Sequence, residues 1–427
     1  AVAGRIRAWR EHGGIIFADL HDDSGKIQLC FRKDVLSTVD CRLLTLLDIG
    51  DFLGVSGELF KTKAGELSIL VKDLTLLSKS LRPLPSEWYG LKDIEERYRK
   101  RYLDLLMNPE VREVFETRTK ILTLLCQYLD EHGFLEVETP ILQPIYGGAS
   151  ARPFTTHLEA LDTDLYLRIS DELYLKRLVV GGFEKVYEVS KDFRNEGIDR
   201  QHSPEFTVIE FYWAYADYED LMKFTEEMLS SVIKEVCGDL KVEFEDQTLD
   251  FTPPWPRVTY RDLVFEQTGI DIDEVKTEEE LRRAISEGGP RQGKPSEVEE
   301  LARPRLDLAG AVGYGSVLDA LYKEYCRPKV IQPTFLIDHP AETVALAKRK
   351  EEDPSKIARF QLLVSGYEVI NAYNELNDPR DQKKRWLEQE GLARKGLTEH
   401  EALDEDYIEA LEYGMPPTAG WGIGMRK

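Results

Sequence analysis

The first 80 residues alternate between apolar and polar side chains with a period of two, and this pattern constrains the fold more than any other feature. The alternating residues are Ile15 and Phe17 before a turn at 22–25, Ile27, Leu29 and Phe31 after it, and Leu67, Ile69 and Val71 after a second turn at 63–65. Successive side chains on a strand point to opposite faces, so this alternation is typical of half-buried strands. Several short strands in residues 1–80 predict a small β-barrel.

The rest of the chain predicts a larger domain in which helices and strands mix. Pro83 and Pro85 mark a linker, which we place at 81–100. Apolar residues between Ile121 and Leu129 follow helical spacing, and Gly133 stands where a glycine would end that helix. We therefore expect an α+β protein. Its barrel would cover 1–80, and the OB-fold is a common nucleic-acid-binding example of such a barrel. Its second domain would cover 101–427, with a helix-rich, charged insertion near 260–330.

The charge of the chain restricts how it could bind nucleic acid. Its 427 residues carry a formal net charge of −23. Such an acidic chain is a poor non-specific binder, because phosphate contacts need Lys and Arg. Any RNA site must therefore be local. The basic run at 97–101 is one candidate, and a solvated helical face is an equally good interpretation of it.

Several other classes of protein are disfavoured. The five cysteines include no CxxC pair, which argues against a zinc site or a disulfide framework and suits a reducing compartment. No apolar run reaches membrane-spanning length, so we expect a cytoplasmic protein without a membrane partner. There is no P-loop, and Gly313-Tyr314-Gly315 lacks the third glycine of a dinucleotide fingerprint. An ATP site would need another architecture.

Candidate binding chemistry lies in the run 193–212, where two strand-like segments flank a loop at 197–204. The side chains that share a face by strand parity are Glu188, Arg194 and Glu196 before the loop, and Phe206, Val208, Glu210 and Tyr212 after it. A guanidinium suits a phosphate or a carboxylate, and an aromatic ring stacks on a base. Ordinary ion pairs on a solvated face are the alternative interpretation.

A second run, at 368–378, places Asn371, Tyr373 and Glu375 on one strand face. Two glutamates that converge from separate strands would suit the ammonium group of a ligand. The reason is that a charge buried in a pocket is costly unless it is paired.

A third run, at 414–425, alternates Gly420, Gly422 and Gly424 with larger residues. Glycines on one strand face allow a flat group or another backbone to approach closely. A bend or tight packing explains this pattern equally well.

At these residues the chain resembles the class II lysyl-tRNA synthetases over nearly its whole length. The motifs are GFLEVETP at 133–140, FRNEG at 193–197, NAYNELNDP at 371–379 and GMPPTAGWGIG at 414–424. They are similar to motif 1, motif 2, the amino-acid pocket strand and the opening of motif 3 of that family. Residues 1–80 are similar to its anticodon-binding OB domain. Four motifs in the same order make this a specific match.

The resemblance implies a fold and a reaction. The fold is a six-stranded antiparallel class II catalytic sheet flanked by helices, in a homodimer with the motif 1 proline at the interface. The lysine carboxylate attacks the α-phosphate of ATP to give lysyl-adenylate and pyrophosphate, and the terminal ribose hydroxyl of tRNA(Lys) then takes the lysyl group. Phosphoryl transfer needs mainly positioning and charge neutralisation, which these residues can supply. The implied cofactor is Mg²⁺, with ATP as a substrate.

The resemblance also implies roles residue by residue. Arg194 matches the arginine that bridges the lysine carboxylate and the α-phosphate. The other matches to ATP contacts are Glu196 at the adenine, His202 at the outer phosphates and Phe206 stacked on the base. The matches to the lysine site are Gly148 and Glu172 at the α-amino end, and Glu210, Tyr212, Asn371, Tyr373 and Glu375 around the side chain. Glu368 matches a magnesium ligand. Arg10, Phe17 and Gln28 match anticodon contacts, and a place in the barrel core is the alternative for Phe17.

The sequence departs from the family in three places. Gln361 stands where the family has a second glutamate that binds magnesium, so its amide oxygen is a candidate ligand. After Met425 the family continues with Asp-Arg and a long helix, whereas Arg426 and Lys427 end this chain. The chain also opens inside the first barrel strand, and we expect that both ends are cut short.

Three other functions remain to be weighed against a tRNA ligase. A paralogue that modifies a translation factor, such as the enzyme acting on elongation factor P, lacks the OB domain. A non-catalytic RNA-binding relative is suggested by Gln361 and by the incomplete motif 3. Aspartyl and asparaginyl synthetases hold a short acidic or amide side chain, which the paired Glu210 and Glu375 fit badly.

Overall fold

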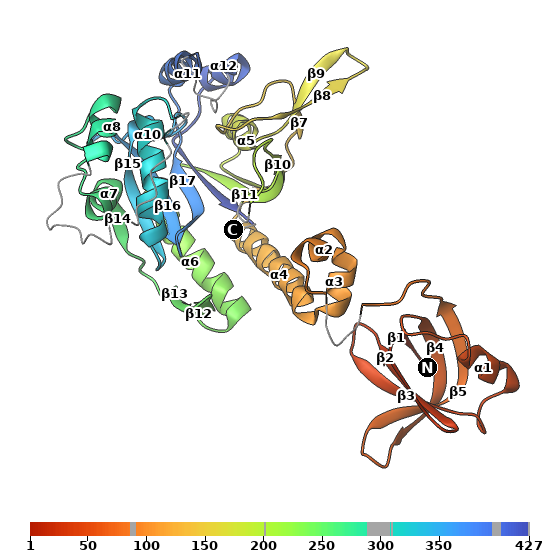
Figure 1. Ribbon diagram of the computed structural model, residues 1–427. Coiled ribbons are helices and arrows are strands. Elements are labelled where there is room, and N and C mark those ends of the chain that lie inside the picture. The colour runs from red at the N-terminus through yellow and green to blue at the C-terminus, as the bar shows by residue number, and fades with distance from the viewer. Residues whose placement is uncertain (86–90, 200–201, 288–307, 309–310, 395–402, 426–427) are drawn as a thin grey trace. The chain divides into compact units, whose positions relative to one another are not determined.

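The computed structural model describes residues 1–85, 91–199, 202–287, 308, 311–394 and 403–425 (Figure 1). The chain divides into two compact units, Ala1–Glu116 and Thr117–Lys427. Among the described residues, no helix is both long and apolar enough to span a bilayer.

The first unit contains a closed barrel, as the alternating pattern predicts. Its strands are β1 (Val2–His12), β2 (Ile15–His21), β3 (Lys26–Arg32), β4 (Phe52–Lys61) and β5 (Leu67–Ser78), in the order β1-β2-β3-β5-β4. Alternate residues such as Ile16, Ala18 and Leu20 of β2 are buried in the barrel core. The helix α1 (Thr38–Leu44) begins after Ser37, whose hydroxyl accepts a hydrogen bond from the Asp40 N–H and so caps the first turn.

Two short helices, α2 (Ile94–Arg99) and α3 (Arg101–Met107), follow in the same unit. Each basic side chain of the run 97–101 lies beside a carboxylate: Arg97 and Arg101 beside Asp104, Arg99 beside Glu95, and Lys100 beside Glu96. These ion pairs offset the local positive charge. The structure therefore favours an ion-paired helical face over an RNA-binding patch for this run.

The second unit is built on a sheet in the order β14-β15-β16-β17-β18-β11-β10-β6. The bounds of these strands are β6 (Leu135–Glu136), β10 (Lys185–Phe193), β11 (Glu205–Ala214), β14 (Arg257–Thr259), β15 (Thr334–Pro340), β16 (Lys356–Val364), β17 (Tyr367–Asn374) and β18 (Thr418–Gly424). The strands from β15 to β10 are antiparallel, and β14 and β6 pair in parallel at the two edges. The sheet therefore has the expected antiparallel core, with one added strand at each edge.

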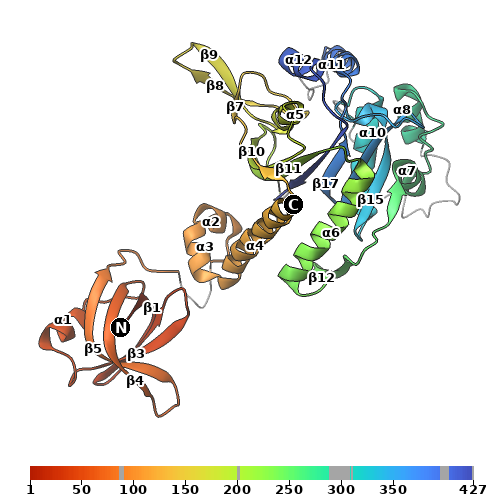
Figure 2. The same ribbon diagram turned by 180° about the vertical axis from the view of Figure 1, so that it is seen from behind.

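Helices α4 (Pro109–Glu131) and α6 (Tyr218–Cys237) cover one face of this sheet (Figures 1 and 2). Leu125 and Leu129 of α4 and Leu221 and Met228 of α6 pack in one core with the sheet residue Phe211. On the other face, α5 (Glu172–Val180), α11 (Pro379–Ala393) and α12 (Glu405–Glu412) contribute to a second core. Successive strand residues divide between the two cores, as the pleat of a strand requires.

The ends of these helices follow signals in the sequence. Asp217 and Asp220 form a reciprocal capping box at the start of α6, and Gly238, with φ 79°, ends it. Gly133 has φ 80° after α4, which confirms its predicted place. Smaller elements complete the unit: a sheet of β7 (Leu142–Gln143), β9 (Thr163–Leu167) and β8 (Phe154–Leu158), and a hairpin of β12 (Lys241–Phe244) and β13 (Gln247–Asp250).

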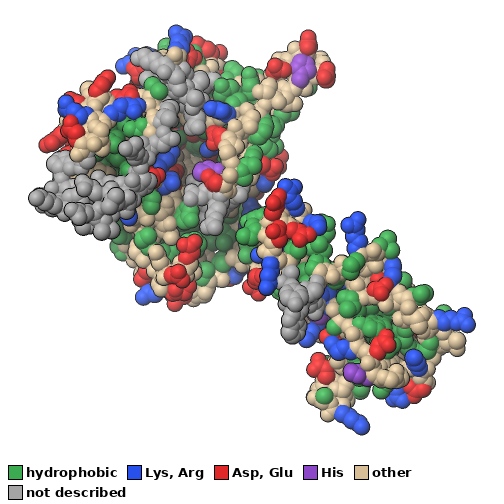
Figure 3. All heavy atoms as spheres, in the orientation of Figure 1, with side chains coloured by type: hydrophobic (Ala, Val, Ile, Leu, Met, Phe, Trp, Pro, Cys, Tyr) green, Lys and Arg blue, Asp and Glu red, His purple; other side chains and the backbone are tan. Residues whose placement is uncertain are grey.

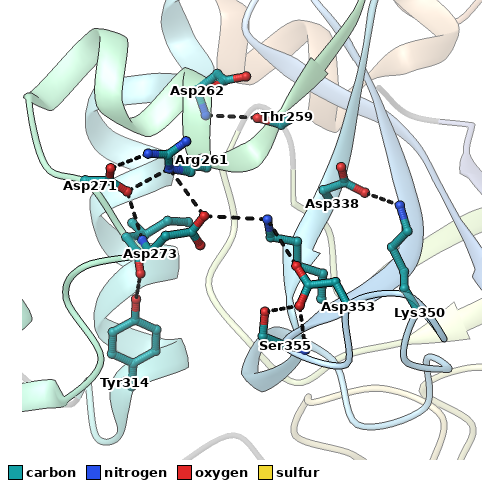
Figure 4. Close-up of polar contacts among 12 residues, drawn as sticks. Thr259, Arg261, Asp262, Asp271, Asp273, Tyr314, Asp338, Lys350, Asp353 and Ser355 are labelled. Carbon is teal, nitrogen blue, oxygen red and sulfur yellow. Dashed lines mark hydrogen bonds and ion pairs between the residues drawn. The ribbon is translucent and has the colours of Figure 1, made fainter.

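The predicted helical insertion lies between β14 and β15. Its described elements are α7 (Tyr260–Thr268), α8 (Glu278–Glu287), α10 (Tyr314–Leu321), a π-helical turn (Tyr322–Cys326) and a 3-10 turn (Arg327–Lys329); a further 3-10 turn (Ala341–Thr343) follows β15. A polar network joins the insertion to the sheet (Figure 4). In it, Arg261 pairs with Asp271 and Asp273, and Lys356 of β16 lies 3.6 Å from Asp273 and 3.4 Å from Asp353.

Candidate active site

A cavity of about 280 Å³ opens on the sheet face that carries α5. The residues predicted from the sequence that line it are Glu172, Arg194, Glu196, His202, Phe206, Glu210, Tyr212, Glu368, Asn371, Tyr373 and Glu375. The glycines of β18 line it as well. The structure thus brings the three sequence runs together around one space.

The strand register explains how these side chains meet. β18 lies between β11 and β17, so two rows cross the sheet here: Glu210–Gly422–Asn371 and Tyr212–Gly420–Tyr373. A Cβ at Gly420 would lie 2.1 Å from Oε1 of Glu375 and 2.6 Å from Cε1 of Tyr212. Any side chain at Gly420 would therefore collide with Glu375 and Tyr212, so the structure favours the tight-packing interpretation of the glycine pattern at this position.

Arg194 and Phe206 form one part of the cavity wall. The Cζ atom of Arg194 lies 5.1 Å from the centre of the Phe206 ring, and its Nε donates to the carbonyl of Ile169 at 3.3 Å. The backbone N–H of Arg194 donates to the carbonyl of Pro204 at 2.9 Å and closes the intervening loop. The half-buried guanidinium is therefore held beside an aromatic ring, an arrangement that suits a phosphate next to a flat base.

The loop between β10 and β11 carries Glu196 and His202, and both are exposed. Asp199 orients His202, because its carboxylate accepts the His202 backbone N–H at 2.7 Å and lies 2.7 Å from Nδ1. With Nδ1 engaged, Nε2 is the ring nitrogen that can meet a ligand.

Lys176 of α5, which sequence reasoning missed, lies among the acidic groups of the cavity. Its ammonium is 2.5 Å from Oε1 of Glu172 and forms a second ion pair with Glu375. It also lies 5.9 Å from the ring centre of Tyr212 and 5.7 Å from that of Tyr373. Burial alone would lower the pKa of Lys176, but the attraction of Glu172 and Glu375 outweighs it and raises that pKa. The i,i+4 spacing of Glu172 and Lys176 could have indicated the pair.

More carboxylates lie beneath this pocket. Asp171, Asp192 and Glu210 each place a carboxylate oxygen within 4.8 Å of the other two. Burial raises the pKa of all three, that of Asp171 to about 6, and the neighbouring carboxylates raise those of Asp192 and Glu210 further. The buried Arg168 lies 2.7 Å from Glu188 and 3.4 Å from Asp192. Sequence reasoning did not single out Asp171, Asp192 or Arg168, although Glu188 and Asp192 share a strand face.

Gly148 and Gln361 do not line the cavity. Gly148 has φ 82°, and a Cβ there would lie 3.2 Å from the Cβ of Glu172, so it packs against the start of α5. Gln361 is buried on β16, where its Oε1 accepts a hydrogen bond from the Tyr322 hydroxyl at 3.0 Å and lies 3.2 Å from Nε2 of His339. A role of Gln361 in metal binding remains a prediction.

In the first unit, Arg10, Phe17 and Gln28 share the outer face of the barrel. Arg10 pairs across the strands with Phe17, and Gln28 with Asp19, which is two residues from Phe17. Phe17 is half-buried and lies outside the barrel core, which argues against the core alternative. Nη2 of Arg10 lies 2.5 Å from Oδ1 of Asp19. On the face shown in Figure 3, basic and acidic side chains are interspersed over this unit.

Known families match both units. Residues 93–427 match the model of the class II tRNA synthetases (D, K and N), and residues 1–77 match the OB-fold nucleic acid binding domain. The chain is 50% identical over 425 residues to a lysine–tRNA ligase of Syntrophomonas wolfei, covering 100% of this chain and 83% of the relative. It is 49% identical over 424 residues to one of Pelotomaculum thermopropionicum, with 99% and 81% covered. It is also 49% identical over 429 residues to one of Aquifex aeolicus, with 100% and 69% covered.

Proposed function

This chain belongs to the lysine–tRNA ligase family of the class II tRNA synthetases, and on that premise we propose how its cavity works. It is an ATP-dependent ligase that joins lysine to tRNA. The carboxylate of lysine attacks the α-phosphate of ATP and releases pyrophosphate. The terminal ribose hydroxyl of tRNA(Lys) then takes the lysyl group from the adenylate and releases AMP. The observation that supports these residue roles is that one cavity contains both the Arg194–Phe206 pair and a group of glutamates.

The ATP end of the cavity is assigned to the Arg194 region. The guanidinium of Arg194 would bridge the lysine carboxylate and the α-phosphate. It would neutralise the negative charge that develops as the carboxylate attacks and pyrophosphate leaves. Phe206 would stack on the adenine, as aromatic rings do on bases. Glu196 would accept a hydrogen bond from the adenine, and Nε2 of His202 would donate to an outer phosphate when both ring nitrogens carry a proton, since Nδ1 donates to Asp199.

The lysine end follows from a balance of charges. Burial raises the pKa of Glu210 and of Glu375, and a bound lysine would hold both in their charged forms, in which Glu172, Glu210 and Glu375 carry three negative charges against the one positive charge of Lys176. Free lysine carries two ammonium groups, so a bound lysine would neutralise the pocket, as buried charges require. Aspartate and asparagine have one ammonium group each and would leave a glutamate unpaired. Tyr212, Asn371 and Tyr373 would frame the side chain, and Gly148, packed against the start of α5, would allow Glu172 to sit at the α-amino end.

Magnesium is part of the same proposal. Glu368 lines the cavity and offers a carboxylate, and Gln361 lies on the neighbouring strand, where its amide oxygen would have to turn from Tyr322 and His339 to reach the ion. An all-oxygen donor set fits Mg²⁺, which also takes ligands from substrate phosphates. The ion would supply neutralisation of the phosphate charge.

A homodimer formed through the segment similar to motif 1 is proposed as well. Leu135, Ile141, Leu142 and Ile145 are between 39% and 48% exposed and lie close to Pro140 in the chain. Exposed apolar side chains gathered in one segment are typical of a protein interface. Sedimentation should show a dimer, and a monomer at every concentration would contradict this. The proposed location is the cytoplasm, where translation uses charged tRNA.

The function is tested by tRNA charging. Radiolabelled lysine should become linked to a tRNA(Lys) transcript only in the presence of ATP. A transcript with a changed anticodon is the control and should be charged more weakly. If labelled aspartate or asparagine is charged while lysine is not, the proposal is wrong.

Phe17→Ala is expected to weaken tRNA charging without affecting lysyl-adenylate formation. Losing one stacked base costs about 1–3 kcal/mol, which is roughly 5- to 150-fold in kcat/KM for tRNA. Leu77→Ala, at a 56% exposed residue of the same barrel, is the control. Equal losses in charging and in pyrophosphate exchange would show instead that Phe17 supports folding.

Gln361→Glu is expected to lower the magnesium concentration needed for half-maximal lysine activation, because a carboxylate binds a hard cation better than an amide does. The measurement is a magnesium titration of pyrophosphate exchange at fixed ATP. Gln127→Glu, which adds the same charge at an exposed position of α4, is the control. Identical curves for the wild type and Gln361→Glu would mean that residue 361 does not touch the metal.

A further inference from the structure

A group of buried carboxylates lies beneath the cavity, and the proposed reaction does not use all of them. Asp171 and Asp192 are completely buried and do not line the cavity, whereas Glu210 does. One carboxylate oxygen of each of the three lies within 4.8 Å of the other two. Glu210 is therefore shared between the cavity and this carboxylate group.

The buried oxygens of the group lack hydrogen-bond partners, although Oδ1 of Asp192 lies 3.4 Å from Nε of Arg168. Asp171 stands at the N-cap of α5, where an aspartate usually accepts a hydrogen bond from the first turn, yet it makes no such bond. Neither oxygen of Asp171, neither oxygen of Asp192 nor the hydroxyl of Ser190 has a hydrogen-bond partner. Burial raises the pKa of Asp171, and contacts with Glu210 and Ser190 partly lower it, which places both side chains beside it. Unpartnered buried oxygens from a helix and a strand thus converge on one point.

The group also lacks compensating charge. Among the described residues, no Lys or Arg side chain forms an ion pair with Asp171 or Glu210, and Arg168, at 3.4 Å from Asp192, lies closer to Glu188 at 2.7 Å. Burial and Asp171 raise the pKa of Asp192 while Arg194 and Arg168 lower it, so among the described residues the three carboxylates share one ion-paired cation and one more distant cation. Buried carboxylates are costly unless they are paired or coordinate a metal.

We propose that Asp171, Asp192 and Glu210, together with the hydroxyl of Ser190, bind one divalent cation of the oxygen-preferring class, Mg²⁺ or Mn²⁺, without the help of ATP. Any two oxygen ligands of such a cation lie about 3–4.5 Å apart, and one oxygen from each of the three carboxylates lies within 4.8 Å of the other two, so a small shift of these side chains would bring them onto one ion. Carboxylate and hydroxyl donors select hard cations over soft ones. This site is separate from the ion that Glu368 would share with ATP.

One consequence rests on the proposed function. Glu210 would serve both the cation and an ammonium group of lysine. Loss of the cation should therefore change the KM for lysine more than the KM for ATP.

The test is the binding of Mn²⁺ to the purified protein without ATP or lysine, measured from the loss of the electron paramagnetic resonance signal of free Mn²⁺. One Mn²⁺ per chain, displaced by excess Mg²⁺, is expected. Asp171→Asn and Asp192→Asn should each lose this binding, and Glu368→Gln should keep it. Both Asn substitutions remove charge at nearly constant volume, so in the cation-free protein they should keep or raise the Tm. Mn²⁺ should then raise the Tm of the wild type and of Glu368→Gln, and leave the Tm of both Asn variants unchanged.

Absence of stoichiometric Mn²⁺ in the wild type would overturn the proposal and indicate that the carboxylates hold protons instead. Unchanged binding in both Asn variants, or loss only in Glu368→Gln, would overturn it as well. Failure of the protein to activate lysine would contradict the proposed function and leave this binding result intact.

Discussion

Arg194→Ala is expected to reduce kcat/KM for lysine-dependent pyrophosphate exchange by roughly 10³-fold or more. An arginine that stabilises charge on a transferring phosphoryl group is worth about 10³- to 10⁵-fold in rate. Arg194 is the arginine of the cavity wall, held beside Phe206 and anchored by the carbonyl of Ile169. The measurement is exchange of labelled pyrophosphate into ATP at varied lysine and ATP.

Two further variants make the Arg194 result specific. Arg380→Ala removes a guanidinium whose side chain is 91% exposed and should leave exchange unchanged. Arg194→Lys keeps the charge but loses the planar fork, so it should fall between wild type and alanine. A loss below tenfold in Arg194→Ala, with an unchanged Tm, would assign the phosphate contact to another residue.

Glu375→Gln is expected to raise the KM for lysine by roughly 10²- to 4 × 10³-fold. Removing one partner of a buried charge pair costs about 3–5 kcal/mol, and each 1.4 kcal/mol is tenfold in affinity. Glu375 is almost completely buried, lines the cavity and pairs with Lys176. In this variant two glutamates would face three positive charges, those of Lys176 and of the two ammonium groups of lysine.

The KM for ATP separates a pocket effect from a folding effect in this variant. It should change little in Glu375→Gln, because the proposed ATP contacts come from other residues of the cavity. Glu388→Gln, at a 63% exposed side chain, is the matched control. An unchanged KM for lysine would place the ammonium pocket elsewhere, and equal rises in both KM values would indicate general disruption.

Much of the fold follows from local pattern. Period-two alternation predicts β2, β3 and β5, and helical spacing with Gly133 predicts α4. The order of the strands in the sheet does not follow from local sequence pattern. β18, at 418–424, inserts between β11, at 205–214, and β17, at 367–374, and pairings over such separations depend on the whole folded sheet.

The site was predictable to the extent that its residues belong to recognisable strand runs. Parity places Glu210 and Tyr212 on one face, and the structure keeps them there. The partners of these residues were not predictable, because burial decides which charges must pair. Lys176 reaches Glu375 across a long stretch of sequence. The end of the segment similar to motif 3 cannot be compared with the family in the same way, since Arg426 lies outside the described residues.

The central claim is that this cavity selects lysine by its two ammonium groups. The most direct test is pyrophosphate exchange into ATP with each of the twenty amino acids at equal concentration. Exchange driven by lysine, with aspartate and asparagine at background, is the predicted result. Exchange driven by aspartate or asparagine, with lysine inert, would contradict the account.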